Sequence, residues 1–228
     1  KDTVSDAVAN LERRLKEKGL QQLMVFADPP TAVIEVDGKV LGNLVHDTGN
    51  SYGIYSAYST RLLVDGNHVY SMSTGIYNYS AGDEAGDGVT ITNNRVHEVS
   101  TGISANYEGV VRGNVVWAAT SSGISGTSIG ELSGNTVWGS ATGISFSGNA
   151  IENNTLTANN VGLAFSSGVA SGNRIYGNAL GVDSNGNSLL RNNLISHATG
   201  AAGMAIGFKE ASNALVENNE IIYCAVGI

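Results

Sequence analysis

The 228-residue chain has one cysteine, two prolines and few charged side chains. Because Cys224 is the only cysteine, no internal disulfide can form. Charged residues make up 14% of the chain, against about 25% in typical globular proteins. The net charge of −8 leaves no basic stripe to neutralise phosphates, which argues against binding to nucleic acid. No run of about 18 apolar residues occurs, so the sequence predicts no membrane span.

Asparagine and glycine, in contrast, recur in one repeated unit. Asn135-Thr136-Val137 is followed six residues later by Gly143-Ile144, and Asn154-Thr155-Leu156 is followed in the same way by Gly162-Leu163. Successive units begin 19 to 27 residues apart, which is too short a period for repeats of paired helices. The asparagines that begin the units are Asn43, Asn67, Asn94, Asn114, Asn135, Asn154, Asn173, Asn193 and Asn219.

Aliphatic residues align in three columns when the units are superposed on this asparagine. They stand three residues before it (Leu132), two residues after it (Val137) and directly after the glycine (Ile144). Side chains alternate across a strand, so all three columns can point into one tube. We therefore predict an all-β fold, a single right-handed parallel β-helix of about nine coils over residues 37–228. The asparagines are expected at a tight corner, in the left-handed conformation that asparagine tolerates, with their amides bonded from coil to coil.

Residues 1–36 break the repeat and are predicted to form an N-terminal cap. Apolar residues recur at helical spacing over residues 2–19, and Gly19 provides a stop signal. An α-helix there would cover the open end of the tube. A basic helix that binds a partner is the alternative, because Arg13, Arg14, Lys16 and Lys18 gather in its last turns. The segment 20–36 is expected to add short cap strands, interrupted at Pro29-Pro30.

The residue three positions after each repeat asparagine is predicted to point outward. Six of the nine positions in this column carry an aromatic or imidazole ring, namely His46, Tyr70, His97, Trp117, Trp138 and Tyr176. A stripe of exposed rings at steps of ~4.8 Å could stack against the sugars of a polysaccharide. The alternative is a ladder of rings that stabilises its own sheet.

Two groups of residues could bind a metal ion. The insertion AGDEAGDG carries Asp83, Glu84 and Asp87, whose carboxylates suit Ca²⁺, although a solvated acidic loop is the alternative. His197, Met204 and Cys224 are the one concentration of soft ligands, and together they suit Cu(I). The alternative for Cys224 is a buried small apolar side chain, and for Met204 a residue that fills a gap.

Signals for catalysis are weak. A glycoside hydrolase needs paired carboxylates, and a polysaccharide lyase needs a proton acceptor beside a neutralising cation. No spacing in the sequence dictates such a pair, although fragments of either site can be assembled from Asp47, Glu98, His46, His97 and Arg95. We therefore leave a lyase, hydrolase or epimerase as the enzyme-class alternative.

The repeat columns over residues 37–228 resemble the pectate-lyase-like superfamily of right-handed parallel β-helices. The stretch GMAIGFKEASNALVENNEIIYCAVGI, residues 203–228, resembles the repeats of the NosD-type periplasmic copper-binding family. This second resemblance implies export and a part in the maturation of a copper enzyme. No active-site motif of a polysaccharide lyase, galacturonase or alginate epimerase is recognisable.

Our leading functional hypothesis from the sequence is an exported β-helix, extracellular or periplasmic, that binds a polysaccharide through the ring column. A NosD-like copper-binding accessory protein is the second alternative, beside the enzyme. Because the chain opens on charged residues and stops directly after a Gly-Ile pair, we expect it to be part of a longer chain, and a homo-oligomer is also open.

Overall fold

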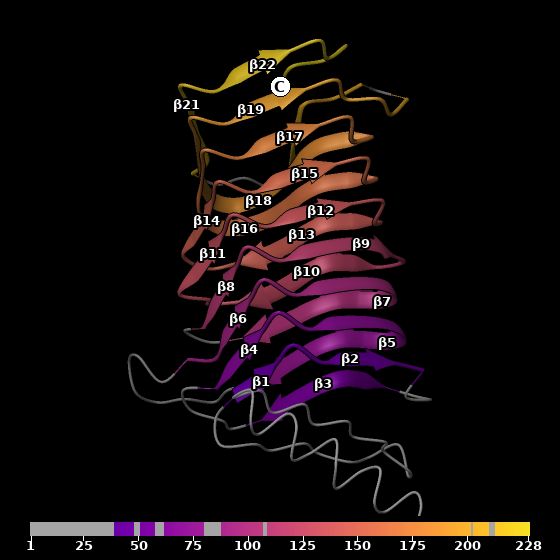
Figure 1. Cartoon of the computed structure of the whole chain (residues 1–228). Coiled ribbons are helices and arrows are strands. Elements are labelled where there is room, and N and C mark those ends of the chain that lie inside the picture. Colours follow the sequence, from indigo (N-terminus) through magenta and orange to yellow (C-terminus); the bar gives the residue numbers. More distant parts are fainter. Residues whose placement is uncertain are drawn as a thin grey trace, which may run out of the picture.

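The chain coils into a solenoid of parallel β-strands, in which each coil lies on the one before it (Figure 1). All the paired strands run parallel, and each residue pairs with its equivalent in the next coil, as Val137 does with Leu156. This computed structural model describes residues 39–47, 51–57, 62–79, 88–106, 109–201, 203–209 and 213–228.

Each coil contributes strands to three faces, which we name by their order along the repeat. The first face precedes the repeat asparagine. It contains β1 (Lys39–Leu41), β4 (Leu63–Asp65), β6 (Thr90–Thr92), β8 (Val110–Arg112), β11 (Glu131–Ser133), β14 (Ala150–Glu152), the ends of β16 (Val161–Ser171) and β18 (Leu180–Arg191), and β21 (Leu215–Glu217).

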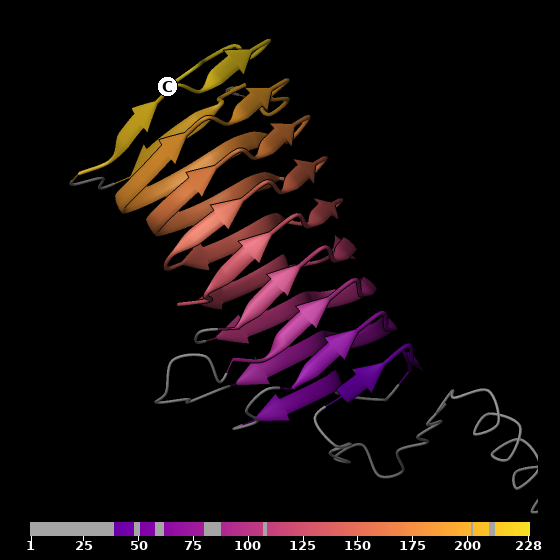
Figure 2. The same cartoon turned by 60° about the vertical axis from the view of Figure 1, so that its left-hand side comes forward.

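The second face directly follows the asparagine. It contains β2 (Leu44–His46), the starts of β5 (His68–Tyr79) and β7 (Arg95–Asn106), β9 (Val115–Ala119), β12 (Thr136–Trp138), β15 (Thr155–Thr157), β17 (Arg174–Tyr176), β19 (Leu194–Ser196) and β22 (Glu220–Ile222). The third face contains β3 (Tyr52–Ala57), the ends of β5 and β7, β10 (Ser122–Thr127), β13 (Thr142–Ser147), the starts of β16 and β18, and β20 (Ile206–Lys209). Figure 2 shows the faces stepping upward together from the indigo to the yellow coils.

The repeat asparagines form the predicted amide ladder. The Nδ2 of each asparagine donates a hydrogen bond to the Oδ1 of the asparagine in the next coil, at 2.8–3.0 Å. The same Oδ1 also accepts a hydrogen bond from the backbone N–H of the lower asparagine, as in Asn135 and Asn154. The ladder satisfies the backbone at a corner that is almost fully buried from Asn67 to Asn193.

The left-handed conformation, however, falls on the residue before the ladder asparagine rather than on the asparagine itself. The preceding residue has φ near +60° throughout and is glycine or a second asparagine, as at Gly134 and Asn153. The residue four after the ladder asparagine is left-handed as well, for example Glu98 at φ 53°. The prediction of an αL ladder asparagine was therefore wrong by one position, since the bend is made just before the ladder side chain turns inward.

The three aliphatic columns fill the interior as predicted. Leu132, Val137 and Ile144, one from each face of the same coil, are at most 1% exposed. The glycine before the third column is required by close stacking of the coils. A Cβ at Gly143 would lie 2.5 Å from the carbonyl oxygen of Gly162.

The solenoid has about seven turns rather than nine. The coils at its ends are incomplete, and the last coil has only the isolated bridge of Met204 with Val226 on the third face. The described residues contain no helix, and the helix predicted over residues 2–19 and the cap strands of 20–36 lie outside them.

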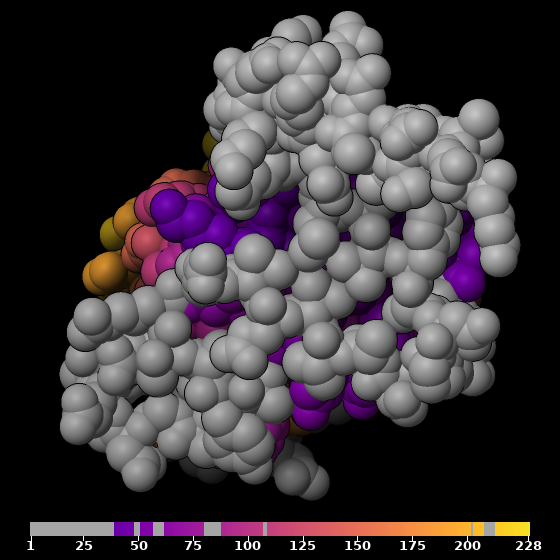
Figure 3. Space-filling view, turned by 60° about the horizontal axis from the view of Figure 1, so that its bottom comes forward, coloured from indigo at the N-terminus to yellow at the C-terminus, as the bar shows by residue number. Residues whose placement is uncertain are grey.

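None of the elements in the described part is a helix able to cross a membrane. Figure 3 looks at the end where the first described strands, in indigo, lie in front of the later coils.

Candidate functional site

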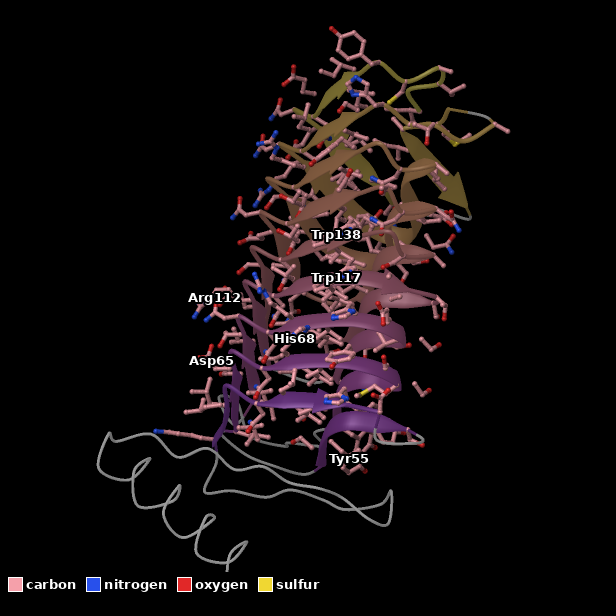
Figure 4. The ribbon with its side chains drawn as sticks, turned by 45° about the vertical axis from the view of Figure 1, so that its right-hand side comes forward. Tyr55, Asp65, His68, Arg112, Trp117 and Trp138 are labelled. Atoms are coloured by element: carbon pink, nitrogen blue, oxygen red, sulfur yellow. The ribbon has the colours of Figure 1, made fainter. Side chains whose placement is uncertain are left out.

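The predicted ring column exists on the second face, and five of its six rings stack on one another. His46 lies on Tyr70, Tyr70 on His97, His97 on Trp117 and Trp117 on Trp138, with centroids 4.2–5.2 Å apart and planes within 13°. Figure 4 shows Trp117 and Trp138 one above the other along this face. The sixth ring, Tyr176, is separated from the stack because Thr157 lies between it and Trp138 in register.

This stacking decides which part of each ring can meet a ligand. Because neighbouring ring planes are nearly parallel to one another, each face inside the column is covered by the neighbouring ring. A sugar stacks on an aromatic face, and the column instead turns ring edges outward. The geometry therefore favours the alternative of a ladder that stabilises its own sheet.

His68, which lies outside the ring column, contacts one of its histidines. The Nε2 of His68 lies 2.9 Å from the Nε2 of His97, with the ring centroids 5.1 Å apart. His68 also lies against Tyr70, at 5.2 Å between centroids. Two imidazole nitrogens from successive coils thus point at each other on the outer surface of β5 and β7, and Figure 4 shows His68 below Trp117.

The register of the strands brings this pair together. His68 pairs with Arg95 across β5 and β7, and His97 stands two residues further along β7 on the same side. Such diagonal neighbours are within reach of long side chains. His68 was not predicted as a site residue, because it lies outside the column three residues after the asparagine. The position one after the asparagine points to the same side and would have revealed it.

A carboxylate lies beside the Nδ1 atom of His97 and another beside the Nδ1 atom of His46. Oε1 of Glu98 is 3.6 Å from Nδ1 of His97, a nitrogen that is buried and has no hydrogen-bond partner. Nδ1 of His46 lies 2.9 Å from Oδ2 of Asp47. A carboxylate at one nitrogen of a histidine is the usual outer partner of a metal ligand, because it fixes the ring while the other nitrogen binds.

The pKa of His68 is lowered from its ordinary value of 6.5. Burial is the main cause, followed by the charges of His97 and Arg95. A lowered pKa keeps the imidazole of His68 neutral near neutral pH. The neutral form is the one that can bind a metal ion.

The predicted soft-ligand group has three different sets of neighbours. His197 aligns with Tyr223 in the next coil, with ring centroids 4.9 Å apart. Cys224 packs partly buried against the core, and its thiol donates a 3.5 Å hydrogen bond to the carbonyl of Ile222. Met204 forms a β-bridge with Val226.

The remaining predicted site residues are distributed as follows. Asp83, Glu84 and Asp87 lie outside the described residues. Asp47 and Glu98 each accompany the histidine that precedes them, and Arg95 stands beside His68. Within the part of the chain that the structure describes, no three or more His, Cys, Asp or Glu side chains form a group that could hold a metal ion.

Comparison with known proteins gives one match. The family model of NosD, periplasmic copper-binding protein, matches residues 29–186. The matched region contains the ring column and the His68–His97 pair, and it ends before the residues 203–228 that carry the sequence resemblance. Searches of curated proteins and of solved structures gave no match.

Proposed function

Because the chain belongs to the NosD family of periplasmic copper-binding proteins, we propose that it is a periplasmic accessory protein with copper as its cargo. We propose His68 and His97 as the residues that hold it. The observation that carries this assignment is the 2.9 Å approach of their two Nε2 atoms. Copper would take the place of this hydrogen bond.

The chemistry of the two side chains suits this cargo. Imidazole is a good ligand for copper, and Cu(I) is stable with as few as two ligands. His68 is kept neutral by its lowered pKa, so no proton has to be displaced from a charged ring. Glu98 lies beside Nδ1 of His97, where a carboxylate can hold the ring so that Nε2 faces His68.

The polysaccharide hypothesis has less support. It needs exposed ring faces, and these faces are covered within the stack. The family match concerns a copper-binding protein. We therefore rank copper binding above carbohydrate binding for this surface.

Tryptophan fluorescence provides a direct test. Trp117 and Trp138 are the only tryptophans, and Trp117 stacks on His97 at 4.2 Å between centroids. Anaerobic titration with Cu(I) in the presence of a competing chelator should quench their emission with a stoichiometry of about one ion per chain. Exchange of copper for the chelator, followed by its absorbance, gives the affinity independently.

The variants are chosen to keep the ring stack. His97→Phe retains a flat ring against Trp117 but removes both nitrogens, and it should abolish chelator-resistant binding. His68→Ala should do the same. His46→Phe is the matched control, because it removes an imidazole at the outer end of the same column. Binding that survives in both His68→Ala and His97→Phe would reject the proposed site.

A further inference from the structure

An arginine, Arg95, stands beside the histidine pair in the register of the strands. Arg95 is the register partner of His68 on β7, and His97 lies two residues beyond Arg95 on the same outward side. The three side chains therefore occupy the corners of one triangle on two adjacent strands. Arg95 is exposed, whereas His68 and His97 are partly buried.

We propose that Arg95 makes the His68–His97 pair select monovalent over divalent metal ions. This inference rests on the proposed function in that it concerns the same pair. It adds the class of ion that the pair accepts and the residue that sets the choice.

Coordination chemistry is the first reason. Zn²⁺ is almost always bound by four ligands, and Cu(II) prefers a tetragonal set. The described residues bring no third His, Cys, Asp or Glu side chain to the pair. A guanidinium has no lone pair to donate, so Arg95 fills the third corner without becoming a ligand. Monovalent d10 ions such as Cu(I) and Ag(I) accept the two nitrogens alone.

Charge is the second reason. The repulsion between Arg95 and a bound ion is twice as large for a divalent ion as for a monovalent one. Glu98 is the nearby opposite charge, and its contact is with Nδ1 of His97, at the far side of the ring from the pair. Glu98 therefore does not lie on the side of His97 that faces the pair, so it does not offset the charge of Arg95 there.

The test compares Ag(I), which is monovalent and does not change oxidation state, with Zn(II). Wild-type protein should bind Ag(I) and bind Zn(II) much more weakly. Arg95→Gln removes the charge, so the Zn(II) affinity should rise on the order of tenfold relative to Ag(I). Arg95→Glu replaces the cation with a carboxylate beside two imidazoles, and it should raise the Zn(II) affinity by a further factor on the order of tenfold.

The controls separate this inference from the proposed function. Arg112→Glu makes the same charge change on β8 of the neighbouring first face and should leave the Zn(II) to Ag(I) ratio unchanged. Figure 4 shows Arg112 to the left of His68. His97→Phe in the Arg95→Glu background should remove the gained Zn(II) binding. An equal affinity of wild type for the two ions, or an unchanged ratio in Arg95→Glu, overturns the role of Arg95. Wild type that binds Ag(I) through His97 but does not retain copper against the chelator, with a His97-dependent Zn(II) site in Arg95→Glu, would reject the copper function and keep this inference.

Discussion

Asn135 donates a 3.0 Å hydrogen bond from its Nδ2 to Oδ1 of Asn154, while its own Oδ1 accepts two hydrogen bonds from Asn114. Its Nδ2 also donates to the carbonyl of Val111. Asn135 thus ties together three successive coils at one buried point. The same contacts recur along the ladder, so each buried asparagine provides hydrogen bonds to backbone and amide groups that are shielded from water.

Replacing Asn135 with alanine should lower the free energy of unfolding by about 3–4 kcal/mol, since four hydrogen bonds are lost and buried groups are left unpaired. Asn78 is the matched control, because it is equally buried but its amide atoms have no hydrogen-bond partner. Asn78→Ala should cost clearly less. Urea denaturation followed by circular dichroism measures both, and equal losses would contradict the ladder's role.

The alternation of inward and outward side chains can be checked within one strand. Val137 is fully buried, whereas Thr136 beside it is partly exposed. A carboxylate at position 137 would be buried without a partner, so Val137→Asp should prevent stable folding. Thr136→Asp should change the free energy of unfolding by less than about 1 kcal/mol. Thermal melts of the two variants decide the matter, and similar melting temperatures would show that the register is wrong.

Two glycines of the same coil should respond differently to a methyl group. At Gly143 an added Cβ would collide with the backbone of Gly162, and the coils would have to move apart. At Gly134 the space is open and only the left-handed φ of 61° opposes the change, at a cost of about 1 kcal/mol. Gly143→Ala should therefore destabilise more than Gly134→Ala.

Gly134→Asn provides the control for this comparison. Asparagine already occupies the equivalent left-handed position at Asn93, Asn153, Asn192 and Asn218. The substitution should leave the melting temperature nearly unchanged. A large loss there would mean that space, rather than backbone conformation, limits this corner.

The tyrosines of the third face should make stability fall at alkaline pH. The pKa of Tyr77 is raised above its ordinary value of 10.0 by burial and then by Tyr52, Tyr55 and Tyr79. The folded state therefore keeps its proton where the unfolded chain has lost it. The contribution is fully present below pH 10.0 and is lost as the pH rises through the raised pKa. In denaturation curves recorded above pH 10.0, Tyr77→Phe should make the free energy of unfolding fall less steeply with pH. An unchanged slope would argue against a contribution from Tyr77.

The sequence predicted the architecture because the repeat exposes it. A column that is Val, Leu or Ile in coil after coil has one physical explanation, a shared interior, and Val137 and Leu156 do lie over each other there. The ladder followed from the same alignment. The alignment did not explain why the third column is preceded by glycine. The closeness of Gly143 to Gly162 depends on the shape of the backbone, which the spacing of residues does not give.

The site was harder to predict for a similar reason. The column through His97 was visible, but the contact with His68 is diagonal and joins two different columns. The mutual stacking of the rings also depends on side-chain torsions that no spacing gives. The sequence therefore predicted the ring column but not the stacking that covers the ring faces.

The soft-ligand group near the C-terminus remains a prediction, and copper titration can separate it from the histidine pair. His197 aligns with Tyr223 rather than with Cys224, because each directly follows the register pair Ser196 and Ile222 of β19 and β22. The thiol of Cys224 instead contacts the carbonyl of Ile222 and packs against the core. We therefore expect Cys224→Ser to keep the wild-type copper stoichiometry, measured anaerobically with Cu(I) and a competing chelator. His97→Phe, titrated in parallel, should lose it. Loss of copper in Cys224→Ser with retention in His97→Phe would move the cargo to the group of His197, Met204 and Cys224, and Met204→Leu would then have to weaken binding as well.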